Sequence, residues 1–336
     1  MADRDRVRRA IAHRPVYPVP YRLKFAAGVA ERVQETLGLP DADRSLGNAL
    51  VHLKMAQQPV TAGATADGGQ PDEWGCVWHT DRDGGPYVTG HPLANGGVDA
   101  FTPPDPDWPL RFRGMAQQAE TESDRFILFS LEWSLFERAH FLRGMEQFLV
   151  DMLLEPDLAH ALLDRILGFN LAVIERACQL PIDGIIFGDD YGTQRGLLMS
   201  PALWRQFIGP NLKRLVDVAH RYGARFMLHC CGSIRALLPD MIDAGLDAVN
   251  PVQISTAGME AGGLKRDFGR DIVLWGGGCD TQTVLRSGTP REVRAHVKAQ
   301  VDALAPGGGF VFQQVHNILA GIPPENISAM FDSVRA

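Results

Sequence analysis

The sequence predicts an α/β protein, a (β/α)8 TIM barrel with a loop-rich excursion in its N-terminal third. Three observations support this prediction. Short apolar runs recur after residue 125, helix-sized amphipathic segments separate them, and polar residues follow the ends of the runs. Continuous apolar strands that alternate with helices form parallel sheets covered on both faces. A doubly wound open sheet is the alternative fold.

Composition and charge exclude several classes of protein. The chain has 336 residues, and 33 Lys and Arg against 40 Asp and Glu give a formal net charge of −7. A nucleic-acid binder that relies on bulk positive charge is therefore excluded. No apolar run approaches the roughly 18 residues of a membrane span, and no secretory signal is visible. We therefore expect a soluble cytoplasmic protein with neither nucleic acid nor a membrane as partner.

The first third of the chain has an irregular pattern. Residues 4–13 are predicted to form a basic helix that ends before Pro15, residues 17–22 an extended segment, and residues 41–55 a helix. From 61 to 109 Gly, Pro and Asp become frequent, yet the segment keeps aromatic residues that a disordered linker would mostly lack: Trp74, Trp78, Tyr87 and Phe101. We expect a single domain over 1–336, with 61–109 as an excursion of loops and short strands.

After residue 125 the pattern becomes regular. Apolar runs predict parallel strands at residues 126–131, 184–188, 225–229, 247–250, 272–276 and 310–315. The segments between them place apolar residues three or four positions apart, as amphipathic helices do, at 201–222, 234–244 and 290–304. With the extended segment near Tyr17 and one further strand in the first third, the count reaches the seven or eight that a (β/α)8 barrel requires.

Polar and sulfur-containing side chains follow several of the predicted strands. In chain order they are Asp189 and Asp190, His229 and Cys231, Asn250 and Gln253, Cys279, and His316. The carboxyl ends of parallel barrel strands converge on one face, where barrel enzymes hold their catalytic groups. We therefore expect these residues to form one site.

The pair His229 and Cys231 is the strongest indication of a metal site. The five cysteines are an odd number, so they do not describe a disulfide framework, and each is a free thiol or a ligand. Residues i and i+2 at a strand end can lie on the same side, which brings an imidazole and a thiolate together. Mixed Cys and His ligation suits Zn²⁺, with His316 or Cys279 as the third ligand and one position open for a thiol or water.

Two adjacent carboxylates allow two interpretations. Asp189 and Asp190 are catalytic candidates, or they cap the helix that follows them. The loop behind them is polar, and so is the segment that follows the predicted strand 126–131. We expect a small-molecule substrate to contact residues around the mouth of the barrel, namely Arg22, Glu132, Tyr191, Gln194, Asn250 and Gln253.

Several motifs of this chain resemble those of the uroporphyrinogen decarboxylase superfamily, which also contains zinc- and corrinoid-linked methyltransferases. They are DGIIFGDD at 183–190, HCCGSI at 229–234, GLDAVNPVQ at 245–253, WGGGCDTQ at 275–282, and HNI at 316–318 followed by PPENI at 323–327. The similarity covers most of the chain and is strongest from about residue 183 onward. The resemblance implies a (β/α)8 barrel, in agreement with the strand pattern, and a homodimer.

The two branches of this superfamily differ in their chemistry. The porphyrin decarboxylases look metal-free and bind an acidic substrate with arginines and a central aspartate. Here Arg22 alone stands where two arginines are expected, which argues against porphyrinogen decarboxylation. The methyltransferase branch holds zinc with a His-x-Cys pair, matched by His229 and Cys231, and with a later cysteine, in whose place this chain has His316.

The resemblance and the metal pattern together predict a zinc-dependent methyltransferase that activates a thiol or a similar acceptor, with Asp189 orienting or deprotonating that acceptor. The chain has no Asp-x-His-x-x-Gly corrinoid signature, so a methylcorrinoid donor would arrive on a separate protein. The alternative is a metal-independent carboxy-lyase, in which Asp189 stabilises a cationic intermediate and Arg22 holds a carboxylate. A third hypothesis is a non-catalytic protein that binds a ligand or a corrinoid.

Overall fold

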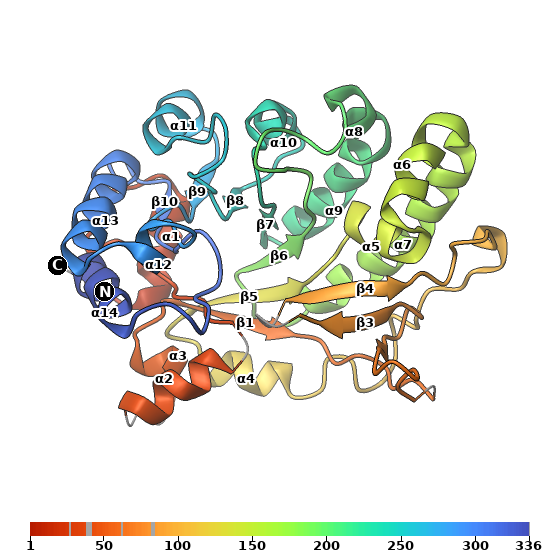
Figure 1. Ribbon diagram of the computed structural model, residues 1–336, viewed down its shortest axis with the longest axis horizontal. Helices are drawn as coiled ribbons and strands as arrows, with labels where there is room; N and C mark the ends of the chain where they lie inside the picture. The colour runs from red at the N-terminus through yellow and green to blue at the C-terminus, as the bar shows by residue number, and fades with distance from the viewer. Residues whose placement is uncertain (27, 38–41, 62, 82–84, 336) are drawn as a thin grey trace.

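The protein is described by a computed structural model for residues 1–26, 28–37, 42–61, 63–81 and 85–335. Its centre is one curved sheet of seven parallel strands, with helices packed around the outer face of the sheet (Figure 1). The strands of this sheet are β1 (Leu50–Lys54), β5 (Phe126–Leu131), β6 (Gly184–Gly188), β7 (Arg225–His229), β8 (Ala248–Asn250), β9 (Val273–Trp275) and β10 (Phe310–Val311).

Helices precede and separate these strands. In the N-terminal third they are α1 (Asp3–Ile11), α2 (Val29–Leu37), α3 (Ala42–Ser45) and α4 (Met115–Thr121). From β5 onward they are α5 (Phe136–Arg143), α6 (Met145–Leu154), α7 (Pro156–Ala177), α8 (Pro201–Phe207), α9 (Gly209–Arg221), α10 (Leu238–Asp243), α11 (Ala261–Phe268), α12 (Val284–Ser287), α13 (Pro290–Leu304) and α14 (Pro324–Arg335). Both ends of the chain lie on the same side of the molecule, near α13 and α14 (Figure 1).

The strand order of the large sheet follows the chain. The order is β1-β5-β6-β7-β8-β9-β10, and every neighbouring pair is parallel. A doubly wound sheet reverses its order at a switch point, and no reversal occurs among the described strands. The alternative fold is therefore wrong, and the predicted strands from residue 126 onward are confirmed as β5 to β10, with β10 shorter than its apolar run.

The two outer strands of the sheet both contact one extended segment near the N-terminus. The backbone of Arg22 donates to the carbonyl of Phe312, and the backbone of Phe312 donates to Pro20, at 3.0 and 2.9 Å. The backbone of Ala49, next to β1, donates to Tyr21 at 2.9 Å. Within the described residues this segment forms isolated bridges and no regular strand. The part of the predicted barrel that is confirmed is one curved sheet of seven parallel strands.

One predicted helix is wrong. Residues 41–55 were expected to be helical throughout, but α3 ends at Ser45 and Leu50–Lys54 forms β1. Gly47 separates the two elements with φ of +71°, and a Cβ at this position would lie 2.8 Å from the Tyr21 hydroxyl oxygen. Strand β1 pairs along its whole length with Phe126–Ser130, so sheet pairing outweighs the helical spacing of its apolar residues.

Helix α1 packs against the inner face of the curved sheet at the amino ends of the strands. Val7, Ala10 and Ile11 of this helix form one apolar cluster with inward-facing side chains from every strand of the large sheet, Leu50, Phe126, Leu128, Ile186, Met227, Ala248, Val273, Trp275 and Val311. The helix bonds to the loops before the strands, because Gly309 donates to Ala10 and Arg4 donates to Asp124. The amino ends of the strands are therefore covered by α1, and the carboxyl ends are left for a site.

The segment between residues 61 and 109 contains a small antiparallel sheet, formed by β2 (Gln70–Pro71), β3 (Val77–Thr80) and β4 (Pro86–Gly90). Trp78 of β3 stacks on Trp133, which follows β5, with ring centroids 4.3 Å apart. The segment thus lies against the carboxyl end of β5. Among the described helices none is long and apolar enough to cross a membrane.

Candidate metal centre and active-site cavity

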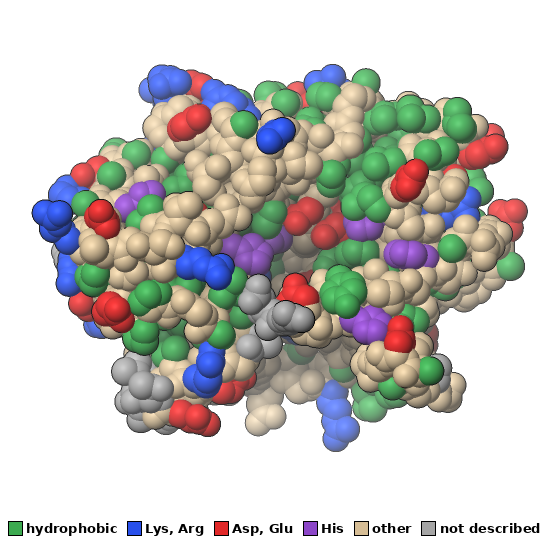
Figure 2. All heavy atoms as spheres, viewed as in Figure 1, with side chains coloured by type: hydrophobic (Ala, Val, Ile, Leu, Met, Phe, Trp, Pro, Cys, Tyr) green, Lys and Arg blue, Asp and Glu red, His purple; other side chains and the backbone are tan. Residues whose placement is uncertain are grey.

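A cavity of about 490 Å³ opens at the carboxyl ends of the strands. This volume lies within the usual range of small-molecule sites. Its walls come from the extended segment at residues 22–26, from the ends of β1, β5, β6, β7 and β8, and from residues 313–319. On the face drawn in Figure 2, histidine and acidic side chains gather near the centre. The position matches the face where the sequence predicted the site.

Three side chains at the carboxyl ends of β6 and β7 form a group suited to a metal ion. Ligand atoms of Asp190, His229 and Cys231 all lie within 4.8 Å of one another. The Cys231 Sγ is 3.5 Å from the Nε2 of His229, and the backbone N–H of Cys231 donates to the Asp190 Oδ1 at 2.7 Å. Parallel pairing of Gly188 with His229 sets the two strand ends level, which brings the residues after them together.

Asn250 of β8 fixes the orientation of the His229 ring. The His229 Nδ1 lies 2.8 Å from the Oδ1 of Asn250, and an amide oxygen only accepts hydrogen bonds. The Nδ1 therefore carries the proton, and the Nε2 lone pair faces the group. Burial and the charge of Lys24 lower the pKa of His229, so its neutral, ligating form is favoured. Metal-binding histidines commonly have such a partner behind them.

The charge of this group fits a divalent cation. Burial and the charge of Asp190 raise the pKa of the Cys231 thiol well above its ordinary value. A thiolate and a carboxylate this close would repel each other, and a bound cation removes that repulsion. Nitrogen, sulfur and oxygen donors from His, Cys and Asp are the set that Zn²⁺ uses in proteins.

The two adjacent aspartates have separate environments. Asp189 is fully buried and accepts the backbone N–H groups of Phe136 and Glu137 at 3.0 and 2.7 Å and the hydroxyl of Tyr191 at 2.7 Å. Burial raises its pKa to about 6. Asp190 lines the cavity and Asp189 does not. The hydrogen bonds of Asp189 therefore hold the start of α5 in place, whereas Asp190 is available to the cavity.

The two candidates for a third metal ligand lie in different places. His316 lines the cavity, and burial together with the charges of Lys24 and His229 lowers its pKa. Cys279 is fully buried among core residues and is not among the described residues that line the cavity. Within the described residues neither belongs to the close metal group, whose third member is Asp190.

The predicted substrate-binding residues also divide into two sets. Arg22, Glu132 and Asn250 line the cavity, whereas Tyr191, Gln194 and Gln253 lie outside its described lining. Gln253 accepts the backbone N–H of Gly232 at 2.7 Å and so supports the loop after β7. The Tyr191 hydroxyl is used by Asp189, and Gln194 is exposed.

Three titratable residues that line the cavity were not predicted to do so, namely Lys24, His52 and Glu137. Burial and the charge of Arg22 lower the pKa of Lys24 and bring that of His52 well below its ordinary value. Burial and the charge of Asp190 raise the pKa of Glu137 well above its ordinary value. Lys24 could have been found from the sequence, because it lies two residues from Arg22 in an extended segment and so shares its side.

Comparison with known proteins identifies relatives along the sequence. Residues 69–336 match the family model of "Uroporphyrinogen decarboxylase (URO-D)". A uroporphyrinogen decarboxylase of Anaeromyxobacter dehalogenans is 24% identical over 267 residues, which cover 76% of this chain and 72% of the relative. One of an Azoarcus species is 28% identical over 194 residues, which cover 54% of this chain and 48% of that protein.

A solved structure shows the same fold over the whole chain. A methyltransferase from Methanosarcina mazei aligns with a TM-score of 0.74 and 21% identity, covering 99% of this chain and 98% of the other. At this identity the likeness concerns the fold alone. The family model spans most of the chain, including the strands that carry Asp190, His229 and Cys231. The resemblance predicted from the sequence motifs is thus confirmed, and the chain belongs to the uroporphyrinogen decarboxylase family.

Proposed function

We propose that the protein is a zinc-dependent methyltransferase that transfers a methyl group to a thiol at the carboxyl face of the sheet. The group of Asp190, His229 and Cys231 within 4.8 Å is the observation that carries this proposal. These three residues would hold the zinc ion. Zinc, when bound, lowers the pKa of a thiol so that the nucleophilic thiolate forms near neutral pH.

The residues around the group would bind and orient the reactants. Asn250 keeps the Nε2 of His229 directed at the group. His316, whose lowered pKa keeps it neutral, lines the same cavity and can accept the proton of the acceptor thiol. The sulfur then forms a bond to the methyl carbon, and the bond from that carbon to the donor breaks with its electron pair left on the donor. A methylcorrinoid carried by a separate protein would be the donor.

The metal assignment is tested by elemental analysis of the purified protein. We expect close to one zinc per chain in the wild type, and less than a tenth of that in His229→Ala and Cys231→Ser. Cys178→Ser and His220→Gln are matched controls, because both residues lie outside the metal group and the cavity lining. These controls should keep the zinc content of the wild type.

The reaction is tested with free methylcobalamin as donor and 2-mercaptoethanol as acceptor, followed by the loss of the cobalt–carbon absorbance. We expect turnover that depends on zinc and fails in His229→Ala. A protein that holds no zinc, or that turns over equally well in both metal-site variants, would contradict the proposal.

A carboxy-lyase is a second candidate, and the positive charge in the cavity favours it. Arg22 and Lys24 lie two residues apart on one extended segment of the cavity wall, and among the described residues the buried Nε of Arg22 has no hydrogen-bond partner. Two neighbouring cations of this kind suit a carboxylate. Since Asp189 lies outside the cavity, Asp190 would have to interact with the intermediate. Carbon dioxide release that survives chelation and is lost in Arg22→Met would favour the lyase over the methyltransferase.

A further inference from the structure

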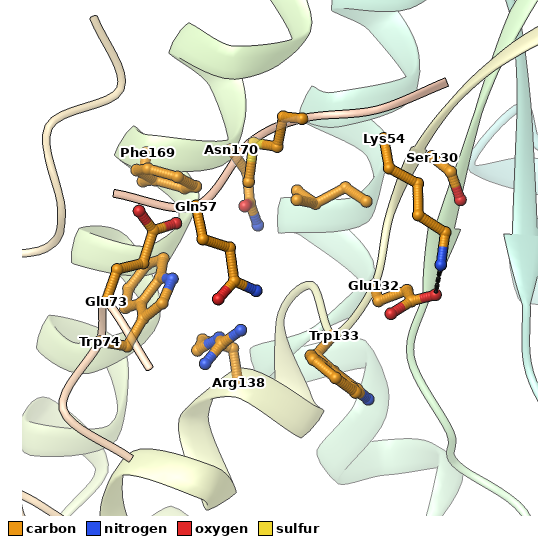
Figure 3. Close-up of a pocket in the computed structure, with 12 residues that line it drawn as sticks. Lys54, Gln57, Glu73, Trp74, Ser130, Glu132, Trp133, Arg138, Phe169 and Asn170 are labelled. Atoms are coloured by element: carbon orange, nitrogen blue, oxygen red, sulfur yellow. Dashed lines mark hydrogen bonds and ion pairs between the residues drawn. The ribbon is translucent and has the colours of Figure 1, made fainter. Parts of the chain in front are cut away.

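A second, smaller cavity adjoins the main one. Its volume is about 80 Å³, and it lies between the ends of β1 and β5, the start of α5, and the segment that carries Glu73 and Trp74 (Figure 3). It shares wall residues with the main cavity, among them Trp133 and the salt bridge in which the Lys54 Nζ lies 2.6 Å from a Glu132 oxygen. A space this small holds one chemical group, so it is a side pocket of the larger cavity.

Aromatic rings form much of the wall of this side cavity. Trp74 and Phe169 pack edge to face with centroids 4.9 Å apart. Trp133 is held against Trp78, and its backbone has φ of +61°, a conformation that non-glycine residues rarely adopt. Such backbone strain is concentrated at functional sites. Flat, fixed walls of this kind favour a planar group.

Arg138 supplies a buried hydrogen-bond donor to the wall of the side cavity. Its side chain lines the side cavity and the residue is only 5% exposed. Its Nη1 donates to Asp72 at 2.9 Å, and its guanidinium lies 4.8 and 5.8 Å from the ring centroids of Trp74 and Trp133. Its Nε is buried without a hydrogen-bond partner in the described part of the protein. Buried donors usually have an acceptor, so this one points to a ligand atom.

The charges around the side cavity are already paired. Arg138 pairs with Asp72, Lys54 with Glu132, and Glu73 with the buried Arg111, the last through two bonds of 2.9 and 3.0 Å. An ionised group that entered would lose its hydration without gaining an unpaired counter-charge. An uncharged acceptor oxygen loses less on entering and still satisfies the Arg138 Nε.

From these observations we propose that the side cavity is a substrate subsite for a small, planar, uncharged group that carries an acceptor oxygen, such as a carboxamide on an aromatic ring. The substrate would extend from this subsite into the main cavity, where its reacting end meets the metal group. The inference rests on the proposed function only because it places the reaction in the main cavity. Whether the subsite itself exists is decided by binding alone.

The subsite is tested with benzamide as a probe, benzoate as its charged counterpart, and calorimetry and crystallography as readouts. We expect benzamide to bind wild-type protein with its oxygen at Arg138, and benzoate to bind at least tenfold more weakly. Arg138→Lys keeps the charge beside Asp72 but removes the Nε donor, so benzamide affinity should fall about tenfold. Met55→Trp fills the side cavity from another wall and should abolish binding even if Arg138→Lys folds poorly.

Arg143→Lys is the matched control for the arginine variant. Arg143 is another buried arginine of α5 that pairs with an aspartate, Asp151, and it lines neither cavity. Its variant should bind benzamide as the wild type does. Equal affinity for benzamide and benzoate, density outside the side cavity, or unchanged binding in Met55→Trp would overturn the proposal. Because binding is measured without turnover, a failure of methyl transfer with benzamide binding intact would remove only the proposed function.

Discussion

Asn250 controls the metal group without belonging to it. Its Oδ1 accepts the Nδ1–H of His229 at 2.8 Å and thereby selects the tautomer in which Nε2 can ligate. Removal of such a partner typically weakens metal binding by about 10- to 100-fold. We therefore expect Asn250→Ala to raise the zinc dissociation constant by that factor in a competition titration with a chelator. Asn250→Asp, which keeps an acceptor oxygen, should restore most of the affinity, and a failure to do so would contradict the orienting role.

His140 predicts a pH dependence of stability that is independent of the metal group. Burial and the neighbouring His91 lower the pKa of His140 to about 4. Because the pKa of His140 in the folded protein lies below its ordinary value of about 6.5, the unfolded protein takes up a proton first as the pH falls. The folded protein is therefore not destabilised by this group above pH 6.5, and it loses stability as the pH falls toward 4. We expect the free energy of unfolding of the wild type to fall by about 2 kcal/mol more than that of His140→Gln between pH 7 and pH 5. Urea unfolding at both pH values measures this difference, and parallel curves would contradict it.

The sequence identified His229 and Cys231 because alternation at a strand end is a strong local rule. The same rule could not decide between Asp189 and Asp190, because the strand ends at Gly188 and the turn that follows sets the direction of each side chain. Only tertiary packing shows that Asp189 bonds to the start of α5. Arg138 was missed for a similar reason, since it contacts Trp74 and Asp72 of the excursion, whose packing the sequence could not show.

At the scale of elements, Asp189 joins β6 to α5. Its two oxygens accept the N–H groups of Phe136 and Glu137, which the helix itself cannot satisfy at its start. We expect Asp189→Asn to lower the free energy of unfolding by about 1–3 kcal/mol, because one buried acceptor is replaced by a donor. Zinc content should stay near that of the wild type. Urea unfolding and elemental analysis give the two readouts.

Asp190→Asn is the matched comparison and should show the opposite behaviour. Asp190 lies in the cavity wall and in the metal group, so this variant should lose zinc with little change in the free energy of unfolding. If Asp189→Asn instead lost its zinc at unchanged stability, the structural role of Asp189 would be wrong.

Most elements after residue 125 could be predicted because each carries its own local signal. Helix α13 begins and ends as expected, and Thr289 with Glu292 forms a capping box at its start. Strand β1 could not be predicted in this way. It lies between α3 and the excursion, and its apolar residues at 50, 51 and 53 fit helical spacing as well as a half-buried strand. Its pairing with β5, more than 70 residues away in the sequence, decides its structure.

At the scale of the whole molecule, the segment at residues 20–26 links the two outer strands of the sheet and also carries Arg22 and Lys24. Asn48 holds this segment in place. Its Oδ1 accepts the backbone N–H of Leu23 at 2.7 Å, and its Nδ2 donates to the Leu23 carbonyl at 3.2 Å. We expect Asn48→Ala to lower the free energy of unfolding by about 2 kcal/mol and to speed hydrogen exchange of residues 20–26.

The control for this experiment is Asn211→Ala. Asn211 is also buried, but its side chain donates to the carbonyl of Phe207 nearby in sequence, so exchange in the extended segment should stay unchanged. Exchange in β5, β6 and β7 should remain slow in both variants. Uniformly faster exchange across the sheet in Asn48→Ala would show that the segment does not open as a separate unit.

The metal group and the side cavity are built from different parts of the chain. The donors lie at the carboxyl ends of β6 and β7, whereas the side cavity is lined by β1, β5, α5, α7 and the segment that carries Glu73 and Trp74. In evolutionary terms these two parts can change separately. Substitutions around Glu73 and Trp74 can therefore alter the shape of the side cavity while the donor atoms of Asp190, His229 and Cys231 stay in place.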